Sequence, residues 1–157
     1  MVGATSYIDI GYNTTREFWD EIVLAAAGRF KTDPTRAHAM AVAIYVSHFL
    51  DWVFHEKHPR EDTFGNPIYV AFKQRHHRAC PELAWLEDLA DVAKHRGIGR
   101  RPVRLKKREG EEGPEDSATH APQAVSASPL MLELNDGTHH PFDQVTERAI
   151  AYWRANR

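Results

Sequence analysis

The sequence predicts a mainly α fold, a four-to-five-helix bundle that carries a small C-terminal antiparallel β hairpin or sheet. The first supporting observation is the stretch 37–58, which is almost continuously apolar, does not alternate and is too long for one strand. The second is the recurrence of apolar residues at helical spacing in the neighbouring segments of 14–96. The third is the alternating segment 130–134, which leads into Asp136-Gly137, a favoured hairpin turn.

Within the single domain 1–157, the helices of the bundle are expected to begin at capping signals. These signals are Thr14 or Thr15 with Glu17 in reach, Asp33-Pro34, Asn66-Pro67 and Pro81. The four helices are expected to end near Phe30, Lys57, Ala79 and His95. The helix that contains 37–58 is predicted to be the central post, buried on most of its circumference. Its apolar run is too short and too often interrupted to predict a membrane span.

The C-terminal third of the chain has a different composition. Residues 97–128 are first basic and then acidic, and we expect them to form a flexible loop between the bundle (14–96) and the C-terminal part (129–157). The strands and the closing helix are expected at 100–108, 130–134, 138–142 and 143–155. An exposed aromatic side chain near the C-terminus, such as Trp153, would favour a homodimer.

The polar residues that interrupt the central helix are His48, Asp51 and His55. Their spacing places them on one stripe of the helix, and burying a polar group without a partner costs roughly 2–7 kcal/mol. Their partners are other side chains, a substrate, or a divalent metal such as zinc, manganese, iron or nickel. One straight helix supplies too few ligands, so a metal would need residues from another helix. His55, near the solvated end, is a candidate catalytic base.

A second stripe with the same spacing lies in the fourth predicted helix and consists of Asp88, Asp91 and His95. Helical periodicity puts Asp91 and Glu87 on a side that we expect to be solvated, whereas the Lys94-His95 end is expected to meet the central stripe. His95 is the second candidate catalytic residue. The candidate polar network therefore comprises His48, Asp51, His55, Asp88, Asp91, Lys94 and His95.

The motifs HFLDW at 48–52 and LEDLADVAKH at 86–95 resemble a set of uncharacterised bacterial proteins. In that set a His-x-x-Asp-Trp helix precedes a helix ending in Lys-His, and a short hairpin and a helix with an aromatic residue before Trp close the chain. Asp136-Gly137 and Tyr152-Trp153 match these last two features. The resemblance covers most of the chain and implies no known activity.

The chain also distantly resembles HEPN domains, which are helical bundles that often bind or cleave RNA. The histidine of the HEPN signature would be His95. The positions that match the signature arginine hold Leu89 and Ala90, so the group expected to hold a phosphate is missing. This difference argues against RNA cleavage.

Composition limits the function classes further. The formal net charge of -2 gives no global field for nucleic acid or an anionic membrane. The basic run 94–108 supports nucleic-acid binding only weakly, because acidic residues follow it at once. Cys80 is the single cysteine and is interpreted as a packing residue, and the pair His76-His77 as surface residues. The N-terminus has no secretory pattern, which predicts a cytoplasmic location.

Three hypotheses about function follow from these patterns. The first is a cytoplasmic interaction or regulatory domain with a buried His/Asp network. The second is a metal-dependent hydrolase of the bundle type that uses some of His48, Asp51, His55, Asp88, Asp91 and His95, in which a bound metal activates water and a leftover carboxylate or His55 acts as base. The third is a HEPN-like domain that binds or cleaves RNA.

Overall fold

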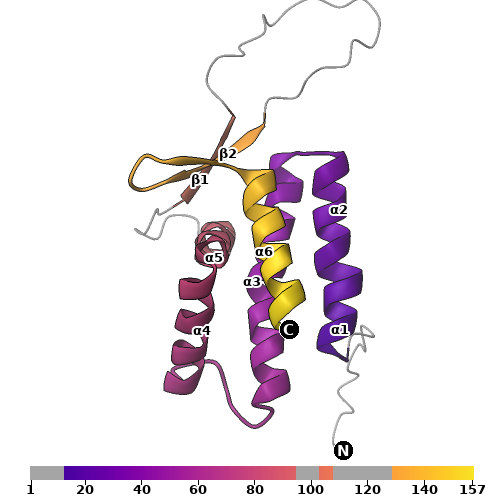
Figure 1. Cartoon of the computed structure of the whole chain (residues 1–157), viewed down its shortest axis with the longest axis vertical. Coiled ribbons are helices and arrows are strands. Elements are labelled where there is room, and N and C mark those ends of the chain that lie inside the picture. Colours follow the sequence, from indigo (N-terminus) through magenta and orange to yellow (C-terminus); the bar gives the residue numbers. More distant parts are fainter. Residues whose placement is uncertain (1–12, 95–102, 108–128) are drawn as a thin grey trace, which may run out of the picture.

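The computed structural model describes residues 13–94, 103–107 and 129–157 and confirms the predicted class, a mainly helical bundle with a small antiparallel sheet (Figure 1). The helices and strands, in chain order, are α1 (Thr15–Glu17), the π-helical η1 (Phe18–Val23), α2 (Leu24–Thr32), α3 (Arg36–Lys57), α4 (Pro67–Ala79), α5 (Pro81–Lys94), β1 (Val103–Lys107), β2 (Leu130–Leu134), β3 (His139–Pro141) and α6 (Phe142–Asn156). Of the predicted loop 97–128, residues 103–107 form β1, and the rest lies outside the described residues.

The first predicted helix is present as one rod made of α1, η1 and α2. It begins with a capping box in which the Thr14 hydroxyl accepts from the Glu17 backbone N–H at 3.1 Å. The Glu17 carboxylate in turn accepts from the Thr14 N–H, also at 3.1 Å. Helical backbone angles continue through both junctions of η1, so the six π-helical residues widen the rod without breaking it.

The predicted start of the central helix was wrong by two residues. Asp33 does not cap α3 but ends α2, where its N–H donates to the Arg29 carbonyl at 2.8 Å. The cap of α3 is Thr35, whose hydroxyl accepts from the His38 N–H at 3.2 Å. The predicted end at Lys57 and the Asn66 cap of α4 are confirmed.

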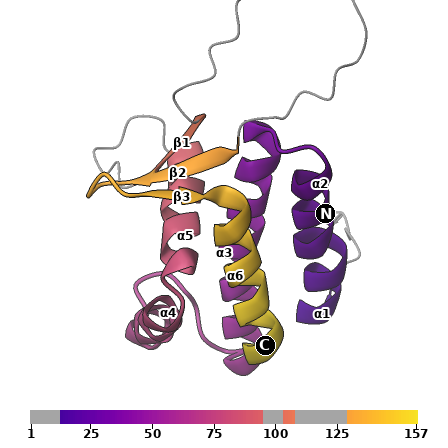
Figure 2. The same cartoon turned by 45° about the horizontal axis from the view of Figure 1, so that its top comes forward.

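The centre of the fold is α3, with the α1–α2 rod, α5 and α6 packed around it (Figures 1 and 2). Phe49 of α3 is fully buried and lies between two tryptophans, with its ring centroid 4.7 Å from that of Trp19 and 5.2 Å from that of Trp153. Burial of each such aromatic side chain contributes about 1.5–3 kcal/mol. Trp153 is 0% exposed, so the argument for a homodimer that assumed its exposure was wrong.

By length and composition α3 also meets the criterion for a membrane-crossing helix, with a mean hydropathy of 1.3. In the described structure 44% of its most apolar window is buried in the bundle, and core helices of soluble proteins meet the same criterion.

The sheet has the order β1-β2-β3 with antiparallel pairing throughout. Leu130 and Leu132 are buried, as their alternation predicts. The hairpin between β2 and β3 turns through three residues, 135–137. Gly137 takes a φ of +82° there and donates to the Leu134 carbonyl at 3.0 Å. Glycine suits this left-handed position because it has no Cβ, which explains the Asp-Gly signal.

Candidate functional site

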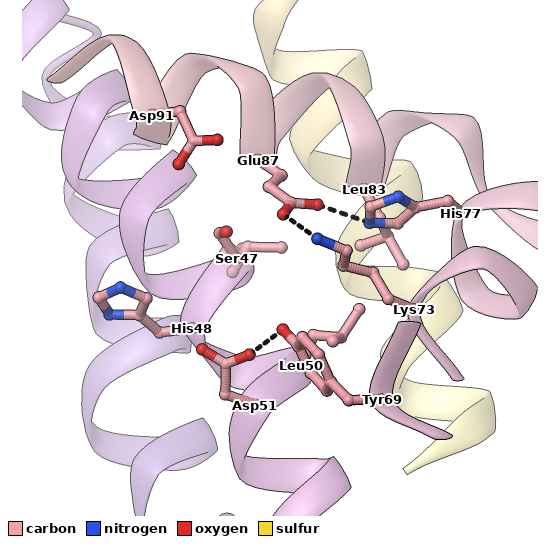
Figure 3. Close-up of a pocket in the computed structure, with 11 residues that line it drawn as sticks. Ser47, His48, Leu50, Asp51, Tyr69, Lys73, His77, Leu83, Glu87 and Asp91 are labelled. Atoms are coloured by element: carbon pink, nitrogen blue, oxygen red, sulfur yellow. Dashed lines mark hydrogen bonds and ion pairs between the residues drawn. The ribbon is translucent and has the colours of Figure 1, made fainter. Parts of the chain in front are cut away.

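A polar cleft of about 180 Å³ lies where α3, α4 and α5 meet (Figure 3). Its polar lining residues are Ser47, His48 and Asp51 from α3, Tyr69, Lys73 and His77 from α4, and Glu87 and Asp91 from α5. The apolar floor is made of Val46, Leu50 and Leu83. We call this site the polar cleft.

The side chains that α4 contributes to the polar cleft are spaced four residues apart, so Tyr69, Lys73 and His77 lie on one face of the helix. The Tyr69 hydroxyl donates a short hydrogen bond to Asp51 Oδ1. Burial, and then this bond to a carboxylate, raise the pKa of Tyr69 far above its ordinary value, so the hydroxyl keeps its proton. This pair connects α4 to the C-terminal half of α3.

The second polar group ties α4 to α5. Lys73 Nζ donates to Glu87 Oε1 at 2.7 Å, and His77 Nε2 lies 3.1 Å from Glu87 Oε2 (Figure 3). Burial alone would raise the pKa of Glu87, but the hydrogen bonds from His77 and Lys73 outweigh it and lower that pKa below its ordinary value. Lys73 Nζ also lies 5.7 Å from the centroid of the Tyr69 ring, which joins the two groups into one network.

His76 faces the core beside these residues and is only 3% exposed. Its Nδ1 is hydrogen-bonded to the Tyr152 hydroxyl at 2.7 Å, and its ring centroid is 4.9 Å from that of Trp153. Burial, followed by the positive charges of Arg75 and Lys57, lowers the pKa of His76 from 6.5 to about 4. The ring is therefore neutral at pH 7.

Cys80 at the α4–α5 junction is a packing residue, as predicted. It is 5% exposed, and its Sγ donates to Glu82 Oε2 at 3.3 Å. Burial, followed by this contact with a carboxylate, raises the pKa of the thiol to about 11.

The structure brings together part of the predicted polar network. His48, Asp51 and Asp91 all line the polar cleft, whereas His55 is exposed on α3 and does not, and Asp88 is not a lining residue. The side chain of Lys94 and all of His95 lie outside the described residues, so the predicted contact between them and the α3 stripe does too. Among the described residues, Asp51 is hydrogen-bonded to Tyr69.

Two expectations about neighbouring residues were wrong. Glu87 was placed on a solvated side of the fourth helix, but its side chain is 24% exposed because α4 packs against that side. The His76-His77 pair was interpreted as surface, but His76 is buried and the His77 side chain is only 19% exposed. The i, i+4, i+8 spacing of Tyr69, Lys73 and His77 in the sequence could have predicted that α4 has a polar face.

The described part of the chain contains no group of three or more His, Cys, Asp or Glu side chains arranged to hold a metal ion. The metal set proposed from the sequence was His48, Asp51 and His55. His55 does not line the cleft that the other two share. The stripe on α3 therefore does not form a three-ligand site by itself.

A second depression lies on another side of α4, where the helix meets the end of α3. It has a volume of about 580 Å³ and is open to solvent. It is lined by Lys57, His58, Ile68, Ala71, Phe72, Arg75 and Arg78. We call it the basic groove, because it contains lysine and arginine side chains and no carboxylate.

Comparisons with known proteins found no similar protein. No family model matches the chain, and no curated protein and no solved structure is significantly similar to it.

Proposed function

We propose that this chain is a non-catalytic binding domain, an interaction or regulatory protein of the cytoplasm, and that α4 presents its binding surface. The proposal is based on the way in which the polar and charged side chains of α4 divide into two sets. Tyr69, Lys73 and His77 point to carboxylates of α3 and α5, whereas Arg75 and Arg78 point to an open groove. The first set fixes the helix, and the second is available to a partner.

The pKa values in the polar cleft support binding over catalysis. A general acid or base works best when its pKa lies near the working pH. The pKa of Glu87 is lowered and that of Tyr69 is raised, so both move away from neutrality. Internal ion pairs and hydrogen bonds of this kind are typical of a structural network.

The metal-dependent hydrolase and the HEPN-like domain are supported by fewer observations. A metal-dependent hydrolase would use some of His48, Asp51, His55, Asp88, Asp91 and His95, of which His48, Asp51 and Asp91 line the polar cleft. An RNA-directed HEPN-like domain would rest on His95 and the basic run 94–108. Metal content of untagged protein checks the first hypothesis. The salt dependence of RNA binding checks the second, because phosphate contacts weaken as salt rises.

In-cell photocrosslinking tests the proposal. A photoreactive amino acid replaces one exposed residue on each face of the bundle, in turn: Glu21, Ala71, Val92 and Arg154. A binding domain is expected to give a discrete covalent adduct with another protein from at least one face, with Ala71 giving the strongest. If no position gives a discrete adduct at the native expression level, the proposal is wrong.

A further inference from the structure

We propose that the basic groove binds an acidic peptide segment of a partner protein, with an apolar side chain of the peptide on the groove floor. This inference rests on the proposed function, because it names the chemistry of the partner. The groove is formed by two elements, the last turn of α3 and the outer face of α4, on the side of α4 away from the polar cleft.

The charge of the groove is uniformly positive. Lys57, Arg75 and Arg78 line it, and α4 contains no acidic residue along its length. Within the ranges 13–94, 103–107 and 129–157, no carboxylate forms an ion pair with any of these three side chains. Carboxylates of a partner are the complementary groups, and arginine binds them through two parallel hydrogen bonds.

The positive charge of the groove also affects a buried neighbour, His76. His76 follows Arg75 in the sequence, and its Nε2 lies 3.5 Å from the Arg75 guanidinium. Burial, and then the positive charges of Arg75 and Lys57, lower the pKa of His76. Like charges repel each other, and no described carboxylate forms an ion pair with these cations, so an anionic ligand would relieve their repulsion. The Arg75 guanidinium is held 5.4 Å from the centroid of the Phe72 ring, which places the cation above the groove floor.

The floor of the groove is apolar. Ile68, Ala71 and Phe72 are spaced i, i+3, i+4 and form one strip of α4, and Ile68 remains 48% exposed. An exposed aliphatic side chain between cations is suited to the apolar anchor of an amphipathic segment.

The floor favours a peptide over a single-stranded nucleic acid. Nucleic-acid sites stack bases on open aromatic faces. Phe72 is only 7% exposed, so its face is not open to a base, and the other ring of the groove, His58, is partly buried and packs against Phe54. The accessible floor is aliphatic, and the anionic groups that fit beside it are carboxylates spaced along a chain that carries apolar side chains.

Selection from a displayed library of random twelve-residue peptides tests the inference. The full-length chain is the bait, and a synthetic copy of the most enriched peptide is titrated by fluorescence polarisation. We expect enriched sequences that combine Asp or Glu with a large apolar residue. Arg75→Glu, Arg78→Glu and Ile68→Asp are each expected to weaken binding at least about tenfold. Replacing the peptide's acidic residues with amides is expected to do the same.

The matched control is Arg154→Glu, the same charge reversal on the exposed C-terminal turn of α6, which is expected to leave affinity unchanged. Far-UV circular dichroism confirms that each variant is folded. Enrichment of peptides without acidic residues, no enrichment, or affinity that the three groove variants leave unchanged would each overturn the inference. So would Arg75-dependent binding of oligouridine or phosphatidylserine vesicles without binding of acidic peptides.

Failure of this inference is separable from failure of the proposed function. Crosslinks from Glu21, Val92 or Arg154, with none from Ala71, would leave a binding domain that uses another face. The absence of crosslinks from every position would remove the proposed function itself.

Discussion

Protonation of His76 is expected to destabilise the fold between neutral and mildly acidic pH. The side chain is buried against Trp153 and bonded to Tyr152, and its pKa falls from 6.5 to about 4. The unfolded chain therefore binds more protons than the folded chain between these two values. The free energy of unfolding rises with pH across this window, and it falls when the pH is lowered through it.

The size of the effect follows from the two pKa values. A difference of two to three pKa units corresponds to about 3 kcal/mol when the pH is lowered through the whole window. Between pH 7 and pH 5 the expected loss is about 2 kcal/mol, because at pH 5 the unfolded histidine is almost fully protonated and the folded one is mostly neutral. This is a large part of the stability of an ordinary domain.

Urea unfolding at pH 7 and pH 5, followed by far-UV circular dichroism, measures this loss. The variant His76→Gln keeps a polar side chain but removes the titration, so its loss between the two pH values is expected to be smaller by about 2 kcal/mol. The control His55→Gln changes an exposed histidine and is expected to behave like the parent chain. Equal losses in the parent and His76→Gln would refute the reasoning.

Three further predictions concern the polar cleft and the thiol. Tyr69→Phe removes the hydrogen bond to the Asp51 carboxylate of α3 and is expected to lower the free energy of unfolding, measured in urea, by about 1–3 kcal/mol. The control Tyr45→Phe, at an exposed tyrosine, is expected to lower it by less than about 0.5 kcal/mol. Equal losses in the two variants would contradict the Tyr69–Asp51 hydrogen bond. A double-mutant cycle of Lys73→Met with Glu87→Gln is expected to give a coupling energy of about 1 kcal/mol, and a value near zero would contradict the ion pair. Burial raises the pKa of the Cys80 thiol to about 11, so in the folded chain at pH 8 the thiol is expected to react with iodoacetamide at least about 100-fold more slowly than in the urea-unfolded chain. Similar rates in the two states would show that the thiol is not buried.

The elements of the fold could be predicted because their signals are local. Apolar periodicity and capping chemistry are written into neighbouring residues, as the capping box at Thr14 and the glycine turn at Gly137 show. The start of α3 was misplaced because two local signals competed. Asp33 and Thr35 are both capping residues, and the need to end α2 assigned the first of them.

The site was harder to predict because it depends on which helix faces which. Asp51 was correctly identified as a polar group of the central helix that needs a partner, but the partner that the structure describes, Tyr69, comes from α4 and was not predicted. A helical wheel of α5 places Glu87 beside Asp91, on the side of the helix that was expected to be solvated. It cannot show that Lys73 and His77 of another helix cover that side. Sequence periodicity gives the direction of a side chain within a helix but not the neighbour that it meets.

The feature that connects these results is the division of α4 into faces. One face, with Lys73, is bonded to carboxylates, and the face with His76 enters the core. The remaining face, with Ile68 and Arg75, is open, apolar and basic. Short polar helices gain little stability from their own propensity, so α4 depends on the first two faces for its position. A partner that binds the third face would meet a helix already held in place, and it would lose less conformational entropy than it would in ordering a free one.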